Sequence, residues 1–142
     1  MLYERLRWRR KKGRLDGALE ILNKKPDELN YTRNWWRERL YLVRRALKDG
    51  YITEAYKIAA EHKLKPGSDF AEGEWLAGWI ALRFLNDRNA ALSHFQRLYE
   101  TSKYPISKAR GAYWAARTSQ KLRAQTQRDV SESSTWLKKA AK

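Results

Sequence analysis

The sequence predicts an all-α fold, organised as an α-solenoid in which antiparallel helix pairs stack into a superhelix. Three observations predict it. Apolar residues recur at steps of three and four, and no stretch alternates with a period of two. Turn-forming residues separate these stretches at regular intervals. A hairpin pattern also recurs roughly every 36 residues, which is typical of helical repeats.

Composition sets the first limits on function. The 142 residues are enough for one domain with a real core, and 13% of them are aromatic, which argues against disorder. The absence of cysteine excludes disulfides, thiolate zinc sites and thiol nucleophiles. No apolar run approaches the length that spans a membrane, so we expect no membrane span. The net charge of +15 favours an anionic partner.

We expect helices near residues 2–12, 15–24, 32–49, 53–63, 69–85, 88–101, 105–122 and 130–141. In the third, one face carries the apolar residues Trp36, Leu40, Val43 and Leu47. Between the last two helices, residues 123–135 are predicted to form a polar connector, which Ser131 ends by capping the final helix.

Turn chemistry places the breaks between the other helices. Gly50 can adopt the left-handed conformation that ends the helix before it. Lys65–Gly67 reads as a turn, and Ser68 or Asp69 is the expected N-cap of the next helix. Pro105 suits a first helical turn, because the proline nitrogen has no hydrogen that would need a partner there.

The helices repeat as pairs. In three successive hairpins an alanine stands five positions after a turn residue. These alanines are Ala18, Ala55 and Ala91, and Ser133 is the candidate for the same position in a fourth hairpin. A short side chain lets two antiparallel helices approach closely. The pattern therefore predicts about four tetratricopeptide-like hairpins in a single segment over residues 1–142.

Several segments, in order, resemble the helical repeats of the soluble lytic murein transglycosylase family. They are Gly13–Leu22, Trp35–Arg39, Ala71–Leu85, His94–Phe95 and Pro105–Arg117. In that family such repeats form a superhelical ring that precedes a separate lysozyme-like catalytic domain. The family cleaves peptidoglycan between N-acetylmuramic acid and N-acetylglucosamine and leaves 1,6-anhydro products. The resemblance implies a periplasmic scaffold that guides a glycan strand, with peptidoglycan or a missing catalytic domain as its partner.

The ends of the chain do not match an exported, complete protein. Seven of the first fourteen residues are basic and no apolar stretch follows them, so we expect no signal peptide. Neither end shows the polar capping helix of a complete repeat array. We therefore expect a fragment of a larger superhelical domain or a truncated gene product.

No catalytic, metal or cofactor site is predicted. Glu132–Ser133 matches the Glu-Ser motif that the resemblance makes catalytic, but the Gly-Leu-Met-Gln type segment that follows it in the family is missing. We expect Glu132 to lie in a first helical turn and this chain alone to be inactive on murein. His62 and His94 are 32 residues apart without a completing ligand set. No phosphate-binding glycine loop occurs.

Candidate contacts to a glycan or another polyanion lie in two places, a basic stretch around Trp8 and the pair Trp35–Trp36. The candidates are Arg7, Trp8, Arg9, Arg10, Trp35, Trp36 and Arg37. Neighbouring residues in a helix point about 100° apart, so we expect one tryptophan of the pair to be buried and the other to face a groove. Trp75 and Trp79 are expected to serve interhelical packing.

A second function stays open. A basic surface that carries a tryptophan also fits RNA, because bases stack on aromatic rings and phosphates bind cations. The alternative is therefore a stand-alone helical-repeat adaptor that binds an acidic protein or RNA. Peptidoglycan with free stem-peptide carboxylates is itself anionic, so charge alone does not separate the two.

Overall fold

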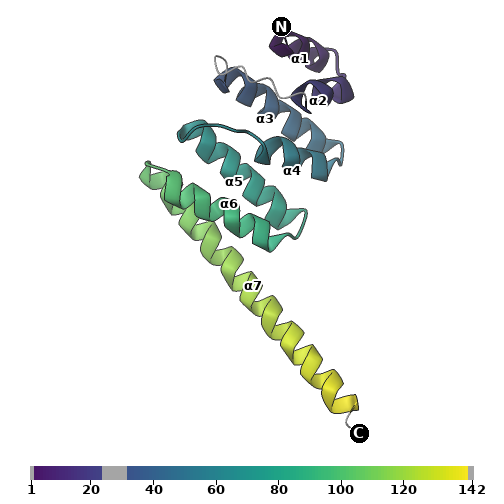
Figure 1. Ribbon diagram of the computed structural model, residues 1–142, viewed down its shortest axis with the longest axis vertical. Coiled ribbons are helices and arrows are strands. Elements are labelled where there is room, and N and C mark those ends of the chain that lie inside the picture. Colours follow the sequence, from purple (N-terminus) through teal and green to yellow (C-terminus); the bar gives the residue numbers. More distant parts are fainter. Residues whose placement is uncertain (1, 24–31, 141–142) are drawn as a thin grey trace.

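The computed structural model describes residues 2–23 and 32–140, and the side chains beyond Ser131 lie outside that description. These residues form seven α-helices and no strand (Figure 1). The helices are α1 (Leu2–Lys11), α2 (Leu15–Asn23), α3 (Thr32–Lys48), α4 (Ile52–Ala60), α5 (Ser68–Arg83), α6 (Arg88–Thr101) and α7 (Pro105–Ala140). The prediction of an all-α chain is confirmed.

Neighbours in the sequence are neighbours in space. The helices pack as the pairs α1–α2, α3–α4 and α5–α6, and α7 packs along α6. Further contacts join α1 to α3, α4 to α5 and α5 to α7. The pairs follow one another along the long axis of the molecule, with the two termini at opposite ends (Figure 1). None of the described helices is both long and apolar enough to cross a membrane.

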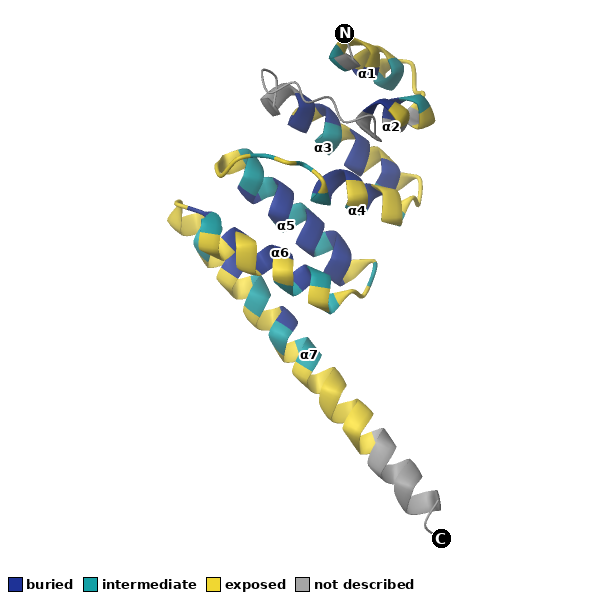
Figure 2. Ribbon diagram, viewed as in Figure 1, coloured by how far each residue is buried: buried dark blue, intermediate teal, exposed yellow. Residues whose placement is uncertain are grey.

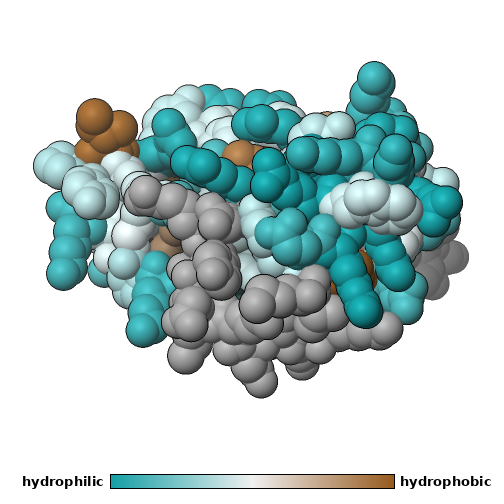
Figure 3. Space-filling model, turned by 90° about the horizontal axis from the view of Figure 1, so that it is seen from above, coloured by the Kyte–Doolittle hydropathy of each residue, from teal (hydrophilic) through white to brown (hydrophobic). Residues whose placement is uncertain are grey.

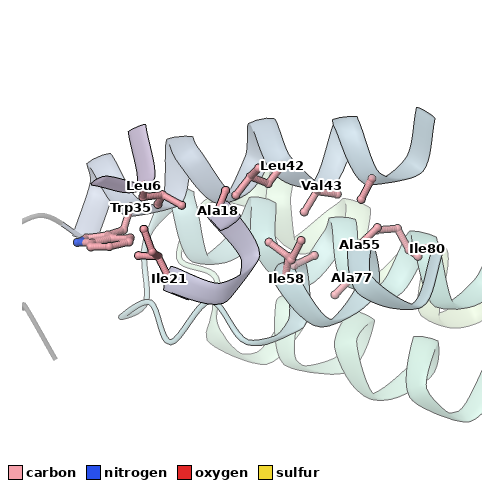
Figure 4. Packing of buried hydrophobic residues seen from close by; sticks show 12 residues of the cluster. Leu6, Ala18, Ile21, Trp35, Leu42, Val43, Ala55, Ile58, Ala77 and Ile80 are labelled. Atoms are coloured by element: carbon pink, nitrogen blue, oxygen red, sulfur yellow. The ribbon is translucent and has the colours of Figure 1, made fainter. Parts of the chain in front are cut away.

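The three predicted alanines lie at the centres of these pairs. Ala18 in α2, Ala55 in α4 and Ala91 in α6 are all fully buried. Ala18 and Ala55 belong to a core that runs from α1 to α5 (Figure 4). A second cluster around Ala91 and Phe95 joins α5 and α6 and is covered by residues of α7. The short side chain at each position lets the paired helices approach closely.

The turns follow the predicted chemistry in part. Gly50 has a φ of 86°, as its predicted cap role requires. Asp87 caps α6 by accepting a hydrogen bond from the Ala90 amide at 3.1 Å. The predicted N-cap of α5 at Ser68 or Asp69 is wrong. The helix starts one residue earlier, with Gly67 at the cap position, because the Ala71 amide bonds to the Gly67 carbonyl at 3.0 Å.

The predicted polar connector at 123–135 is also wrong. A single helix of 36 residues, α7, runs from Pro105 through that stretch to Ala140. Pro105 begins it, as predicted. Residues 112–140 contain neither glycine nor proline, so a polar composition does not break the helix. Ser131 therefore lies inside α7 and caps nothing, while the side chains of Glu132, Ser133, Trp136 and Leu137 fall outside the described part.

Among the described side chains of α7, the buried and half-buried ones lie between residues 107 and 122. Thr118 is fully buried, and Arg88 at the start of α6 donates a hydrogen bond to Gln125. Residues 123–131 are exposed (Figure 2). The two helices approach closely at Gly111, where an added Cβ would lie 2.8 Å from the Tyr99 nitrogen and 3.0 Å from the Phe95 carbonyl oxygen. Glycine is required there because α6 backbone occupies the space.

Candidate polyanion-binding surface

Basic charge is concentrated on α1 and α3. Helix α1 carries five basic residues and one acidic residue, and α3 carries six basic residues and one acidic residue. Helix α5 has a net negative charge, because it carries three acidic residues and one basic residue. Seen from the end that carries α1, the described surface is mostly hydrophilic (Figure 3). The longest helix, α7, carries eight basic and two acidic residues, so the positive charge is densest on α1 and α3 but is not confined to them.

An ion pair fixes α1 against α3. Both oxygens of the Glu38 carboxylate accept hydrogen bonds from Arg10, one of them from Nη2 at 3.0 Å. Glu38 is buried, and the Arg10 guanidinium lies 4.5 Å from the centre of the Tyr41 ring. The hydrogen bond to Glu38 raises the pKa of Arg10 and outweighs the opposing effect of partial burial. Arg10 is thus engaged within the protein.

Arg9 holds α1 to α2 in a similar way. Its Nη1 donates to the Gly17 carbonyl at 2.8 Å and approaches Glu20 at 3.4 Å. Gly17 leaves room for this side chain, since an added Cβ would meet the Arg9 Cδ at 3.0 Å. The two predicted contacts Arg9 and Arg10 therefore position the surface instead of presenting free charge.

The remaining basic candidates are available to a ligand. Arg7 and Arg37 are exposed, and Trp8 keeps 51% of its surface accessible. The Arg14 guanidinium lies 5.4 Å from the centre of the Trp8 ring, and an open groove runs beside that ring between Glu4 and Arg9. Further exposed cations on the same two helices and the turn after α1 are Arg5, Lys11, Lys12 and Arg44. We call the exposed set, with Trp8, the α1/α3 surface.

The prediction for the tryptophan pair is wrong, because Trp35 and Trp36 are both buried, with 7% and 2% of their surface exposed. Trp35 packs edge-on against Tyr3 of α1 at 5.5 Å. Trp36 points toward α5, where its Nε1 donates to Glu72 at 3.1 Å. Because α3 is covered from two sides, side chains 100° apart both enter the core. Neither ring faces a groove.

Trp75 and Trp79 on α5 stack on each other, with centroids 6.1 Å apart and both rings half-buried. The sequence predicted interhelical packing for them. Each ring does pack against a different apolar cluster, Trp79 against the larger and Trp75 against the smaller. Part of each ring still reaches the surface.

A buried network is centred on Glu74, which is 2% exposed, and no pattern in the sequence predicts it. Its carboxylate lies 3.1 Å from Nε2 of His62 and 2.7 Å from Nδ1 of His94. The two histidines are 12 and 20 residues away in sequence, on the segment after α4 and on α6. Only tertiary packing brings them together, so spacing along the chain could not reveal the network.

The hydrogen-bond partners of His62 and His94 place a hydrogen on the ring nitrogen that faces Glu74. Nδ1 of His62 accepts from the Leu64 amide at 2.9 Å, so its Nε2 carries the hydrogen that is donated to Glu74. A carboxylate only accepts, so Nδ1 of His94 donates to Glu74 at 2.7 Å, and Nε2 of His94 lies 2.8 Å from the Tyr56 hydroxyl. The network joins α4, α5 and α6.

Glu74 is ionised over the whole physiological range. Burial alone would raise its pKa, but hydrogen bonds from His62 and His94 and the charges of His94 and Arg97 lower it to about 2. A buried carboxylate that is held ionised by two donors lacks the raised pKa that a general acid needs. The arrangement supports a structural role. The described residues contain no group of three or more histidine, cysteine or acidic side chains placed to hold a metal ion.

This network predicts acid sensitivity. The folded-state pKa of Glu74 lies below its unfolded value of 4.5, so its stabilisation is complete above about pH 4.5 and is lost as the pH falls toward 2. We expect a loss on the order of 3 kcal/mol across this window. Urea titrations at pH 5, 3.5 and 2 measure it. Glu74→Gln is the control, and an equal loss in that variant would assign the effect to other carboxylates.

Comparison of the chain with protein-family models, curated proteins and solved structures gives no match.

Proposed function

We propose that this chain is a substrate-guiding scaffold segment of a peptidoglycan lytic transglycosylase. In this proposal the helix pairs continue as an α-solenoid, which forms part of a curved wall in the periplasm. The wall holds an anionic glycan strand and directs it to a lysozyme-like catalytic domain outside this chain. The observation that carries the proposal is the α1/α3 surface, where exposed cations lie on two helices and Arg14 lies 5.4 Å from the ring centre of the exposed Trp8.

The chemistry of this surface suits the strand. Stem peptides of peptidoglycan carry free carboxylates, and guanidinium and ammonium groups bind carboxylates through charge-assisted hydrogen bonds. The exposed ring of Trp8 offers a flat apolar face beside those charges, on which a sugar ring can stack. A polymer that alternates sugars with carboxylates uses both features at once.

The surface is also held in a fixed geometry. The Arg10–Glu38 pair and the bond from Arg9 to the Gly17 carbonyl hold α1 against α3 and α2. The free cations therefore keep their spacing when a ligand approaches, which lowers the entropy lost on binding. A flexible basic tail would lack this advantage.

Charge reversal on α1 tests the proposal. The combined substitutions Arg7→Glu, Lys11→Glu and Lys12→Glu are expected to reduce cosedimentation with purified murein sacculi about tenfold at roughly 0.15 M salt, where distant charges are screened. The matched control makes the same change in net charge at exposed positions outside the surface, with Lys57→Glu, Lys103→Glu and Arg123→Glu. If the control lost as much binding as the α1 variant, the attraction would be unspecific and the proposal would fail.

The RNA-binding adaptor is tested in the same experiment. Trp8 among basic residues also fits a stacked base between phosphates. Single-stranded RNA is therefore titrated against the unmodified chain at the same salt concentration. Weaker binding to RNA than to sacculi is expected, and tighter binding to RNA would replace the scaffold with the adaptor.

A further inference from the structure

We infer that α5 and α7 together carry a second binding site, an arginine–aromatic platform that takes the stem-peptide carboxylates of the same glycan strand. It consists of three pairs in which a guanidinium lies over a ring, Arg110 with Trp75, Arg83 with Trp114 and Arg117 with Tyr113. The inference rests on the proposed function, because it names a second place where that ligand binds.

Two of these pairs cross between the helices in opposite directions. Arg110 of α7 lies 5.1 Å from the centre of the Trp75 ring of α5. Arg83 of α5 lies 5.8 Å from the centre of the Trp114 ring of α7. These reciprocal contacts make one patch from two helices that are not consecutive in the sequence, and Arg117 extends it along α7 at 5.8 Å from the centre of the Tyr113 ring.

The rings under the arginines are anchored in the core. Trp75 stacks on Trp79, and Trp114 stacks on the fully buried Phe95 at 6.0 Å. Gly78 leaves the space that the Phe95 ring occupies, since an added Cβ would lie 2.6 Å from that ring. The platform therefore presents its guanidinium groups on a rigid base.

The three guanidinium groups lack an anion. Arg83, Arg110 and Arg117 are exposed, and none of them forms an ion pair with a carboxylate in the described part of the chain. On α5, Glu72 is bonded to Trp36 and Glu74 to two histidines. Nη1 of Arg117 donates to the Tyr113 hydroxyl at 3.4 Å, and the guanidinium fork has further N–H groups that can bind a carboxylate in a bidentate way. The patch is thus prepared for an oxyanion.

The surroundings favour a carboxylated glycan over a small anion. Tyr113 is 55% exposed beside Arg117, and Phe84, also exposed, packs edge-on against Trp79 at 5.4 Å. These rings give sugar residues a face to stack on next to the arginines.

The test measures binding of soluble glycan strands that carry stem peptides, and of the same strands after an amidase has removed the peptides. The platform variant combines Arg83→Gln, Arg110→Gln and Arg117→Gln. The control variant removes three other exposed charges, with Lys57→Gln, Lys103→Gln and Arg123→Gln. We expect the platform variant to bind peptide-bearing strands about tenfold more weakly, the control to change less than twofold, and stripped strands to show no difference between the two variants.

A single substitution guards against a folding defect in the triple variant. Arg110→Lys keeps the charge but loses the planar fork, so it is expected to weaken binding about threefold, while Arg123→Lys does not. If both platform variants bind like the unmodified chain while reversal at α1 still abolishes binding, the platform is overturned and the proposed function stands. If the unmodified chain binds no strand, both fail. Tighter binding of RNA than of strands at the platform would also overturn it.

Discussion

Replacing Glu74 with leucine is expected to lower the free energy of unfolding by about 3–5 kcal/mol, the range observed when one partner of a buried charged network is removed. Leucine fills most of the volume but accepts no hydrogen bond. The N–H groups of His62 and His94, which now donate to Glu74 at 3.1 and 2.7 Å, would be left unpaired in the core. The loss would weaken the contacts that join α4, α5 and α6.

Glu74→Gln is the informative control for this prediction. The amide oxygen can still accept from His62, whose tautomer is fixed by the Leu64 amide. The amide NH₂ must face His94, which can change tautomer because the Tyr56 hydroxyl is able to accept as well as donate. We therefore expect glutamine to cost about 1–2 kcal/mol, the scale of one hydrogen bond.

Urea unfolding at pH 7, followed by circular dichroism, measures both variants. We expect the urea midpoint to be highest for the unmodified chain, lower for Glu74→Gln and lowest for Glu74→Leu. The free energy of unfolding is expected to fall with urea at a similar slope in all three. A leucine variant as stable as the unmodified chain would show that the network adds nothing to stability. The buried carboxylate would then need a different explanation.

Replacing Gly111 with leucine is expected to cost about 3 kcal/mol, at the upper end of the range for overpacked positions. The new Cβ would sit 2.8 Å from the Tyr99 nitrogen and 3.0 Å from the Phe95 carbonyl oxygen. Both atoms are backbone of α6, so no side chain can rotate away. The two helices must separate, and the contacts between α6 and α7 weaken together.

Ala112→Leu on the same helix is the matched control. Ala112 is exposed, so leucine there adds the same bulk without meeting α6. Thermal unfolding of the two variants is expected to differ by several degrees, with Gly111→Leu lower. Equal melting temperatures would contradict the close approach of α6 and α7 at Gly111.

The sequence predicted the elements well wherever local chemistry decides them. Glycine at a positive φ marks the turn at Gly50, and proline marks the start of α7 at Pro105. The alanines that repeat along the chain are buried in the helix pairs. These signals depend on a few neighbouring residues, so they can be read without knowing the rest of the fold.

The failures share a different cause. The stretch at 123–135 is polar, but polarity does not break a helix when glycine and proline are absent. The 100° step between neighbouring helical residues predicts that one of Trp35 and Trp36 is buried and the other faces a groove. In the structure, α3 is covered on two sides, so that expectation fails.

The candidate site was predictable in its chemistry and not in its contacts. The basic stretch of α1 and the exposed Trp8 follow from composition. The engagement of Arg10 by Glu38, 28 residues away, depends on how α1 docks on α3. The pairs Arg83–Trp114 and Arg110–Trp75 likewise form only when α5 and α7 meet.

The central claim is that a glycan strand binds the α1/α3 surface, and the indole signals in a ¹H–¹⁵N spectrum test it most directly. Strands that carry stem peptides are titrated into the labelled chain. We predict that the N–H signal of exposed Trp8 moves progressively, while those of the buried Trp35 and Trp36 stay in place. A Trp8 signal that remains unmoved when the chain is saturated with strand would contradict the claim.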